Sequence, residues 1–154
     1  MLGFVIALKS KAKSKNWIID SKLVNRTISS LLNQKHPAYH IYVAYTDLPD
    51  NPIENKKVSW ISFPYPFLNM EDIEDREVFL TRYTLGNYLP GFYDQGKKSL
   101  YASSFAKKDG CKYIMSVDYD DLLSNKVSAF VNTADSQTNP GWYMDKGYVY
   151  REGT

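Results

Sequence analysis

The chain has 154 residues, a formal net charge of +2 and 44% hydrophobic residues. This length predicts one domain, residues 1–154, that buries roughly two-thirds of its unfolded surface, and the composition is typical of a globular protein. The small net charge gives no support to a nucleic-acid partner. The single cysteine, Cys111, excludes an intramolecular disulfide and fits a reducing compartment.

No apolar stretch approaches the roughly 20 residues that a membrane-spanning helix needs. Residues 2–8 are apolar, but basic residues follow them instead of preceding them, which is the wrong order for a signal peptide. We therefore expect a cytoplasmic protein with no transmembrane segment, one that works at the membrane periphery if its acceptor is built there.

The first part of the chain alternates strand and helix patterns. The apolar run Phe4–Leu8 predicts a buried parallel strand. From Trp17 to about Gln34, apolar residues recur at helical spacing, and the helix must end before His36-Pro37. Ile41–Tyr45 predicts a second strand, and Val58–Phe63 a third. The strand–helix–strand unit has the usual length for a right-handed parallel crossover.

The middle of the chain predicts two helices with an irregular segment between them. Residues 70–85 favour a helix, whereas Gly86–Gly96 contains Pro90 and Gly91 and predicts irregular backbone. Residues 97–108 predict a helix that ends at Asp109-Gly110. Its expected core residues are Leu100, Ala102, Phe105 and Ala106.

Towards the C-terminus, residues 112–117 predict another buried strand, followed by a helix from Ser124 to about Thr133. Residues 142–150 predict two short strands around a turn. This order of elements predicts the α/β class, as a three-layer α/β/α sandwich with a mainly parallel sheet.

An acidic step follows the strand of residues 112–117. Asp118, Asp120 and Asp121 stand within four residues of one another. In an open α/β sheet, ligands bind at the carboxyl ends of the strands. Carboxylates gathered there repel one another unless a cation neutralises them, and Mg²⁺ and Mn²⁺ prefer such oxygen ligands, often shared with phosphates. The step therefore predicts a metal-assisted nucleotide site.

Helix capping is the competing interpretation of these acids. Aspartate and serine favour helix N-caps, and acids in a first turn suit the helix dipole. Asp121 or Ser124 would then cap the helix of residues 124–134. Capping accounts for one or two of the acids, and it leaves the cluster unexplained.

Lysines alternate near the N-terminus, at Lys9, Lys11, Lys13 and Lys15. Such a run fits a solvated loop, and it also fits a loop that faces an anionic ligand. The solvated loop is favoured, because most runs of like charge are solvated.

Five segments in order carry a resemblance to a known family: Val5–Leu8, Ile28–Gln34, Tyr42–Asp47, Gln95–Lys98 and Tyr113–Ser124. With its Asp-x-Asp motif in the last segment, the chain resembles the nucleotide-sugar-binding N-terminal part of GT-A-fold glycosyltransferases, especially the inverting family 2-like group. The resemblance covers most of residues 3–134. It implies a fold of the nucleotide-diphospho-sugar transferase type.

The resemblance also implies roles for individual residues. Asp47 would contact the nucleotide base, although a turn residue before Pro49 is an equal alternative. Lys97 or Lys98 would meet the phosphates or the sugar, with a solvated position expected for one of the two. Asp118 would contact the ribose or support the metal, and Asp120 would bind Mn²⁺ or Mg²⁺ that bridges the diphosphate. Asp121 would cap a helix or support the site from behind.

As a member of this group, the chain would transfer a sugar from a nucleotide-diphosphate sugar to an acceptor hydroxyl, or bind the donor for a partner domain. A glycan and a lipid-linked sugar are both candidate acceptors. Two features depart from the family pattern: Ala7–Ser10 replaces the usual proline and small polar residue, and the chain ends at Thr154. We therefore expect it to lack the acceptor-binding C-terminal part, and the catalytic base stays unassigned.

Two other functions remain open. The first is a non-catalytic nucleotide-binding or interaction module derived from the same fold. The second is a nucleotidyltransferase, which shares the nucleotide and metal chemistry but commonly has a glycine-rich loop after its first strand. Residues 9–16 contain lysines and no glycine, which disfavours the second.

Overall fold

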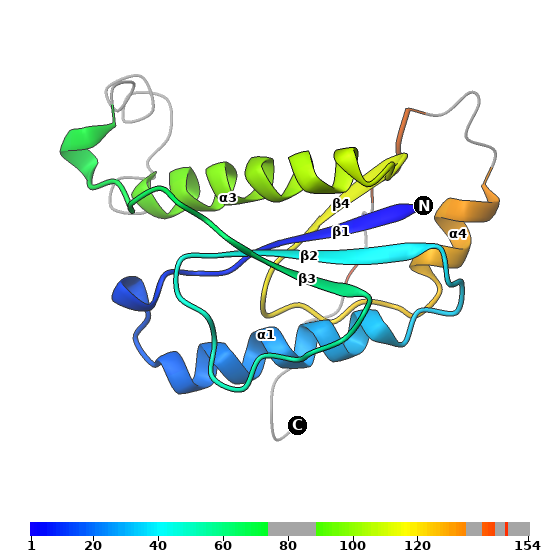
Figure 1. Cartoon of the computed structure of the whole chain (residues 1–154), viewed down its shortest axis with the longest axis horizontal. Coiled ribbons are helices and arrows are strands. Elements are labelled where there is room, and N and C mark those ends of the chain that lie inside the picture. The colour runs from blue at the N-terminus through cyan, green and yellow to red at the C-terminus, as the bar shows by residue number, and fades with distance from the viewer. Residues whose placement is uncertain (74–88, 135–139, 144–146, 148–154) are drawn as a thin grey trace.

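The structure is a computed structural model that describes residues 1–73, 89–134, 140–143 and 147. It has an α/β fold in which helices flank a four-stranded sheet (Figure 1). The strands are β1 (Leu2–Ala7), β2 (Tyr39–Tyr45), β3 (Val58–Ser62) and β4 (Tyr113–Val117). Their order is β3-β2-β1-β4, and every pair is parallel. All four strands predicted within these ranges are present, but the prediction that residues 112–117 form a buried strand is wrong, because β4 lies at the edge of the sheet and only Val117 of its residues is buried.

The helical elements are α1 (Trp17–Leu32), α3 (Leu89–Lys108) and α4 (Val127–Thr133), with short 3-10 helices η1 (Lys11–Lys13) and η2 (Met70–Asp72). Helix α1 confirms the sequence prediction. Of the helix predicted for residues 70–85, the short η2 forms at its start, and residues 74–85 lie outside the described residues. Most of the two strands predicted for residues 142–150 also lie outside them. Within the described residues, no helix has both the length and the apolar character to cross a membrane.

The sheet separates two apolar layers. Helix α1 covers one face and α3 the other, as Figure 1 shows. Phe4 and Ile6 of β1 belong to the buried cluster on the α1 side, together with Val24 and Ile28 of that helix. Val5 belongs to the cluster on the other side, with Ala102 and Ala106 of α3. Alternate residues of β1 point to opposite faces of the sheet, and both faces are buried, which explains the continuous apolar run. The predicted three-layer arrangement is confirmed.

Helix α3 begins earlier than the sequence indicated. The prediction of irregular backbone up to Gly96 is wrong from Leu89 onward, since the helix includes Pro90, Gly91 and Gly96. Proline is tolerated in a first helical turn, where its missing N–H would have no partner in the helix. A single interior glycine costs about 1 kcal/mol relative to alanine, which the packing of a long helix can offset.

The core face of α3 also differs in part from the expectation. Ala102 and Ala106 are fully buried as predicted, but Leu100 is 75% exposed and Phe105 is 37% exposed. The buried side chains recur four residues apart, beginning at Lys98, which places Leu100 on the solvent side of the helix. The small side chains of Ala102 and Ala106 therefore let α3 lie close to the sheet. The buried Lys98 lies on the same face of the helix, one turn before Ala102.

Gly3 makes this close approach possible. A Cβ added there would lie 3.1 Å from the Ala106 Cβ and 3.1 Å from the Cys111 Sγ. Ala106 belongs to α3 and Cys111 lies in the turn into β4, so both neighbours would have to shift to admit the added carbon. The glycine in β1 thus sets the distance between the sheet and α3.

We expect Gly3→Val to destabilise the protein by about 1–3 kcal/mol, because the added side chain overpacks this contact. Gly96→Ala is the matched control: nothing lies within 4 Å of the added methyl group, and helix propensity predicts a gain of up to about 1 kcal/mol. Urea unfolding of the three proteins checks both signs. A Gly3→Val variant as stable as the wild type would show that the approach of α3 is not limiting.

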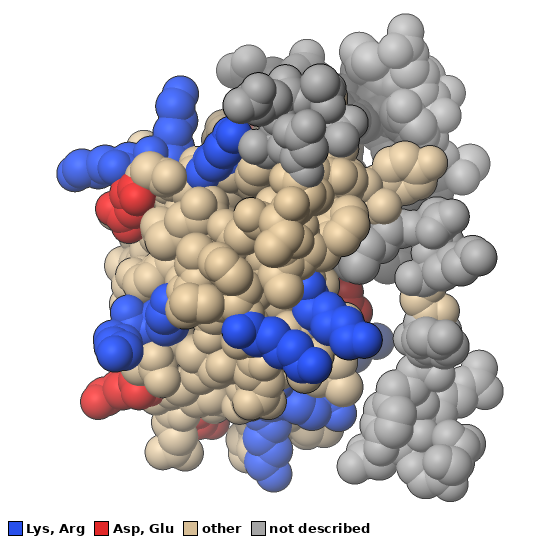
Figure 2. All heavy atoms as spheres, turned by 90° about the vertical axis from the view of Figure 1, so that its right-hand side faces the viewer, with Lys and Arg blue, Asp and Glu red and all other residues tan. Residues whose placement is uncertain are grey.

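Charge is unevenly distributed over the molecule. Figure 2 shows the end of the sheet at which the strands begin, and lysine and arginine side chains far outnumber acidic ones there. Lys57 and Lys112 directly precede β3 and β4, and Lys35 lies shortly before β2. Although the net charge is small, this amino-end face is basic.

Candidate functional site

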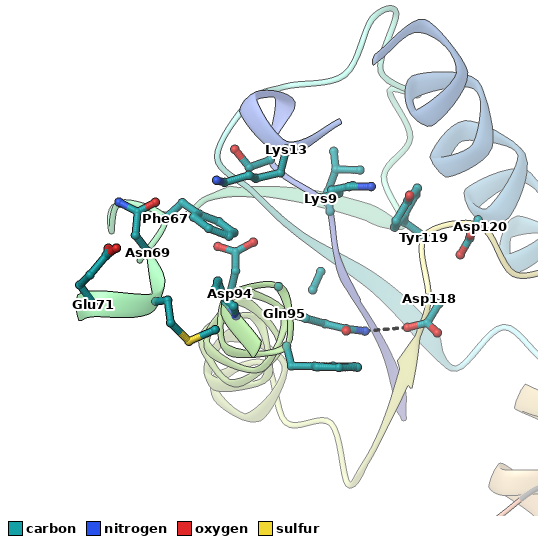
Figure 3. Close-up of a pocket in the computed structure, with 17 residues that line it drawn as sticks. Lys9, Lys13, Phe67, Asn69, Glu71, Asp94, Gln95, Asp118, Tyr119 and Asp120 are labelled. Carbon is teal, nitrogen blue, oxygen red and sulfur yellow. Dashed lines mark hydrogen bonds between the residues drawn. The ribbon is translucent and has the colours of Figure 1, made fainter. Parts of the chain in front are cut away.

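A cavity of about 840 Å³ lies at the carboxyl ends of β1 and β4 (Figure 3). Its walls come from four segments distant in sequence: residues 7–13, residues 67–71, the first turns of α3, and the acidic step. The chain leaves β1 towards β2 on one side, and β4 pairs with β1 on the other. The cavity therefore sits at the point where the strand order reverses, which is where open α/β sheets bind ligands.

Two of the predicted metal ligands line this cavity. Asp118 follows β4 directly, and Asp120 lies two residues further on; both side chains are exposed to solvent. The Gln95 amide Nε2 donates a hydrogen bond of 2.8 Å to Asp118 Oδ1, drawn as the dashed line in Figure 3. Gln95 thus links α3 to the acidic step across the mouth of the cavity.

Tyr119 anchors the acidic step to α1. Its hydroxyl donates to Asp20 Oδ1 at 3.3 Å, and its backbone carbonyl accepts from the Thr27 hydroxyl at 2.8 Å. The pKa of the Tyr119 phenol is raised, first by burial and then by the negative charges of Asp20 and Asp120. Tyr119 is therefore held through both its side chain and its backbone. The backbone that carries Asp118 and Asp120 at the cavity is fixed by these contacts.

The structure contradicts helix capping by Asp121, whereas Ser124 does accept a backbone N–H just before the helix. Helix α4 begins at Val127, and its N-cap residue is Lys126, which makes no side-chain capping hydrogen bond. The hydroxyl of Ser124 accepts from the Lys126 backbone N–H at 3.3 Å, and Asp121 is five residues before the cap. The acidic step therefore precedes the helix without stabilising its first turn.

Asp121 lies outside the cavity lining, but its carboxyl group interacts with the charges of Asp118 and Asp120. Partial burial, and then the negative charges of Asp118 and Asp120, raise the pKa of its carboxyl group. The three carboxylates therefore repel one another, and among the described residues none of them forms an ion pair with a cation.

The two lining aspartates suit a divalent ion that also binds phosphate. Within the described residues, no group of three or more histidine, cysteine, aspartate or glutamate side chains could hold a metal ion alone. Mg²⁺ is commonly bound by one or two carboxylates, with the remaining positions filled by water and by phosphate oxygens of a substrate. Asp118 and Asp120 match that donor set.

The two lysines predicted for the phosphates lie elsewhere. Lys97 is exposed and sits over the Tyr93 ring, with 5.5 Å from its Nζ to the ring centroid. Lys98 is buried, and its ammonium donates to the Leu8 carbonyl and to the Asp94 carboxylate. Neither side chain lines the cavity. A phosphate role for either stays a prediction, and Lys98 already uses two of its three N–H donors within the fold.

Asp47 also lies behind the cavity wall. Its Oδ2 accepts from the Lys11 backbone N–H at 2.8 Å and from the Ser10 hydroxyl at 3.4 Å. Ser10 lines the cavity, whereas Asp47 does not. The carboxylate thus fixes the loop after β1, and its contact with a nucleotide base stays a prediction.

Two lysines of the alternating run line the cavity instead. Lys9 and Lys13 face it, and the Lys13 ammonium lies 4.6 Å from the centroid of the Phe67 ring. Lys11 and Lys15 are exposed and are not part of the lining. Lys11, Lys13 and Lys15 are exposed, as the solvated-loop interpretation expects, whereas Lys9 is half-buried at the cavity. Binding of an anion by Lys9 or Lys13 stays a prediction.

A comparison of the chain with protein-family models, with curated proteins and with solved structures finds no match. The description of the site therefore rests on its own residues and on the position of the cavity in the fold.

The raised pKa of Asp121 predicts a dependence of stability on pH. The folded protein holds this proton more tightly than the unfolded chain, so the free energy of unfolding falls as pH rises from the ordinary carboxyl pKa to the raised one. Asp121→Asn removes this cost. We expect the variant to have a higher thermal midpoint than the wild type at about pH 7, and the difference to shrink towards about pH 4.

Glu54→Gln is the control, because Glu54 is an exposed carboxylate outside the acidic cluster. Melting curves of both variants and the wild type across this pH range provide the measurement. A gain for Asp121→Asn that stays constant with pH would mean that the amide acts through packing and that the clustered charge has no measurable cost.

Proposed function

We propose that the chain binds the diphosphate of a nucleotide-diphosphate sugar with a divalent ion, as a metal-dependent glycosyltransferase of the GT-A type or its donor-binding domain. One observation carries this proposal: Asp118 and Asp120, at the end of β4, line the same cavity as Lys9 and Lys13, after the end of β1. Carboxylates and ammonium groups facing one space suit a ligand that brings both an anion and a cation.

The lysines have a direct role in this proposal. Lys9 is half-buried at the cavity, so its ammonium keeps more of its attraction for a phosphate than a fully solvated charge would. Lys13 is exposed and is oriented by the Phe67 ring. Together they oppose the negative charge that grows on the diphosphate as the sugar leaves.

The aspartates would hold Mn²⁺ or Mg²⁺ against the same diphosphate. The bound ion would supply Lewis-acid stabilisation of the leaving diphosphate. Gln95 fixes one oxygen of Asp118 and leaves the other for the ion. Tyr119 keeps the backbone between the two aspartates in place through its contacts with α1.

Calorimetric titration tests the proposal. We expect UDP or GDP to bind the wild-type protein in the presence of Mn²⁺ and much more weakly without it. Asp120→Asn keeps the size of the side chain but removes its charge, and should weaken metal-dependent binding by about tenfold or more.

Asp121→Asn is the matched control, since it removes a charge from the same cluster at a residue outside the cavity lining. It should leave nucleotide affinity nearly unchanged. Folded wild-type protein that binds neither nucleotide with Mn²⁺ or Mg²⁺ would contradict the proposal and favour the interaction-module alternative.

A further inference from the structure

Lys98 is a fully buried cation beside the cavity. Its side chain is 0% exposed, and its ammonium donates to the Leu8 carbonyl at 2.9 Å and to Asp94 Oδ2 at 2.7 Å. A charge removed from water is strongly unfavourable unless it is paired and hydrogen-bonded. Both contacts therefore hold Lys98 in place, and together they tie the start of α3 to the end of β1.

Asp94, the ion-pair partner of Lys98, lines the cavity. Its side chain is nevertheless only 9% exposed. In Figure 3 its carboxylate points away from α3 towards Phe67. Lys98 occupies Oδ2, whereas Oδ1 makes no hydrogen bond within the described part of the chain. An ionised carboxylate only accepts hydrogen bonds, so this free oxygen is a fixed acceptor facing the cavity.

The surroundings of Asp94 differ from those of the acidic step. Figure 3 shows Asp94, Phe67 and Asn69 on one side of the cavity, with Asp118 and Asp120 on the other. The ring of Phe92, which is 51% exposed, also lines the cavity. A buried acceptor facing an apolar ring suits a ligand with hydroxyl groups and apolar C–H faces, because charge-assisted hydrogen bonds and apolar contacts then form together.

A phosphate group would not suit the position next to the Asp94 carboxylate, even though the Lys13 ammonium over the Phe67 ring lies on the same side of the cavity. The Asp94 carboxylate would repel it, and the ammonium of Lys98 is already committed to two acceptors. A neutral polyhydroxyl group has the opposite preference, since its hydroxyl groups can donate hydrogen bonds to the free oxygen.

We propose that Asp94, positioned by the buried Lys98, accepts hydrogen bonds from hydroxyl groups of the transferred sugar and so forms the sugar-recognising end of the donor cavity. This inference rests on the proposed function, because the sugar reaches Asp94 only if its diphosphate lies between the lysines and the acidic step. Asp94 contacts the substrate, and Lys98 acts as a positioning residue.

The test separates the sugar contribution from the nucleotide contribution. Titrations with Mn²⁺ compare UDP with UDP-glucose and UDP-N-acetylglucosamine, and GDP with GDP-mannose. For the wild type we expect at least one nucleotide sugar to bind more tightly than its diphosphate. Asp94→Asn should lower the affinity for that nucleotide sugar by roughly tenfold, while the affinity for the diphosphate stays nearly the same.

Asp94→Asn leaves the Lys98 charge buried without a counter-charge and thus endangers folding. The double variant Asp94→Asn/Lys98→Met removes both charges and avoids that penalty, and it should show the same selective loss. Lys107→Met is the matched control, because it removes an exposed lysine from the last turn of the same helix, far from the cavity lining. It should change neither affinity.

The outcomes distinguish the two proposals. No binding of either diphosphate by the wild type would overturn the proposed function, and this inference with it. If the diphosphate binds but no nucleotide sugar binds more tightly in the wild type, Asp94 recognises no sugar and only this inference fails. Equal losses for diphosphate and nucleotide sugar in the folded variants would likewise overturn it, by showing a purely structural role for the ion pair.

Discussion

Strand β1 is the constraint on which the remaining structure depends. It pairs in parallel with β2 on one side and with β4 on the other, so the ends of all three strands share one edge of the sheet. The carbonyl of Leu8, just beyond β1, then lies where the Lys98 ammonium can bind it. The cavity follows from this arrangement, because loops leaving β1 and β4 in different directions cannot close over the edge between them.

The acids around the cavity fall into two electrostatic kinds. Asp94 is paired with a cation that the fold itself buries, so it needs no ion from solution. Asp118, Asp120 and Asp121 have no such partner among the described residues, and partial burial, followed by the charges of the other two aspartates, raises the pKa of Asp121. The proposed metal ion would therefore be placed at the second kind. Asp94 differs from the other three aspartates in its burial and in its distance from a cation, and the number of carboxylates in the sequence does not reveal this difference.

The sequence indicated the sheet and α1 because their apolar residues follow the periods of strands and helices, as in Phe4–Leu8 and in Trp17–Leu32. It also indicated the acidic step at the end of β4. It missed the early start of α3, since Pro90 is harmless in a first turn but resembles a helix breaker. It missed Asp94 for another reason: its importance comes from Lys98 and Leu8, and the contact with Leu8 spans 90 residues of sequence.

The pairing of β1 with β4 has a consequence for folding kinetics. Leu2 of β1 lies opposite Tyr113 of β4, whereas its partner on β2 is the much nearer Tyr39. Closing the longer loop costs more chain entropy, so β1, α1 and β2 can associate before β4 joins them. The cavity is completed only by that late step. A ligand that spans it would therefore bind the finished fold and slow its unfolding, leaving the early association of the N-terminal unit almost unaffected.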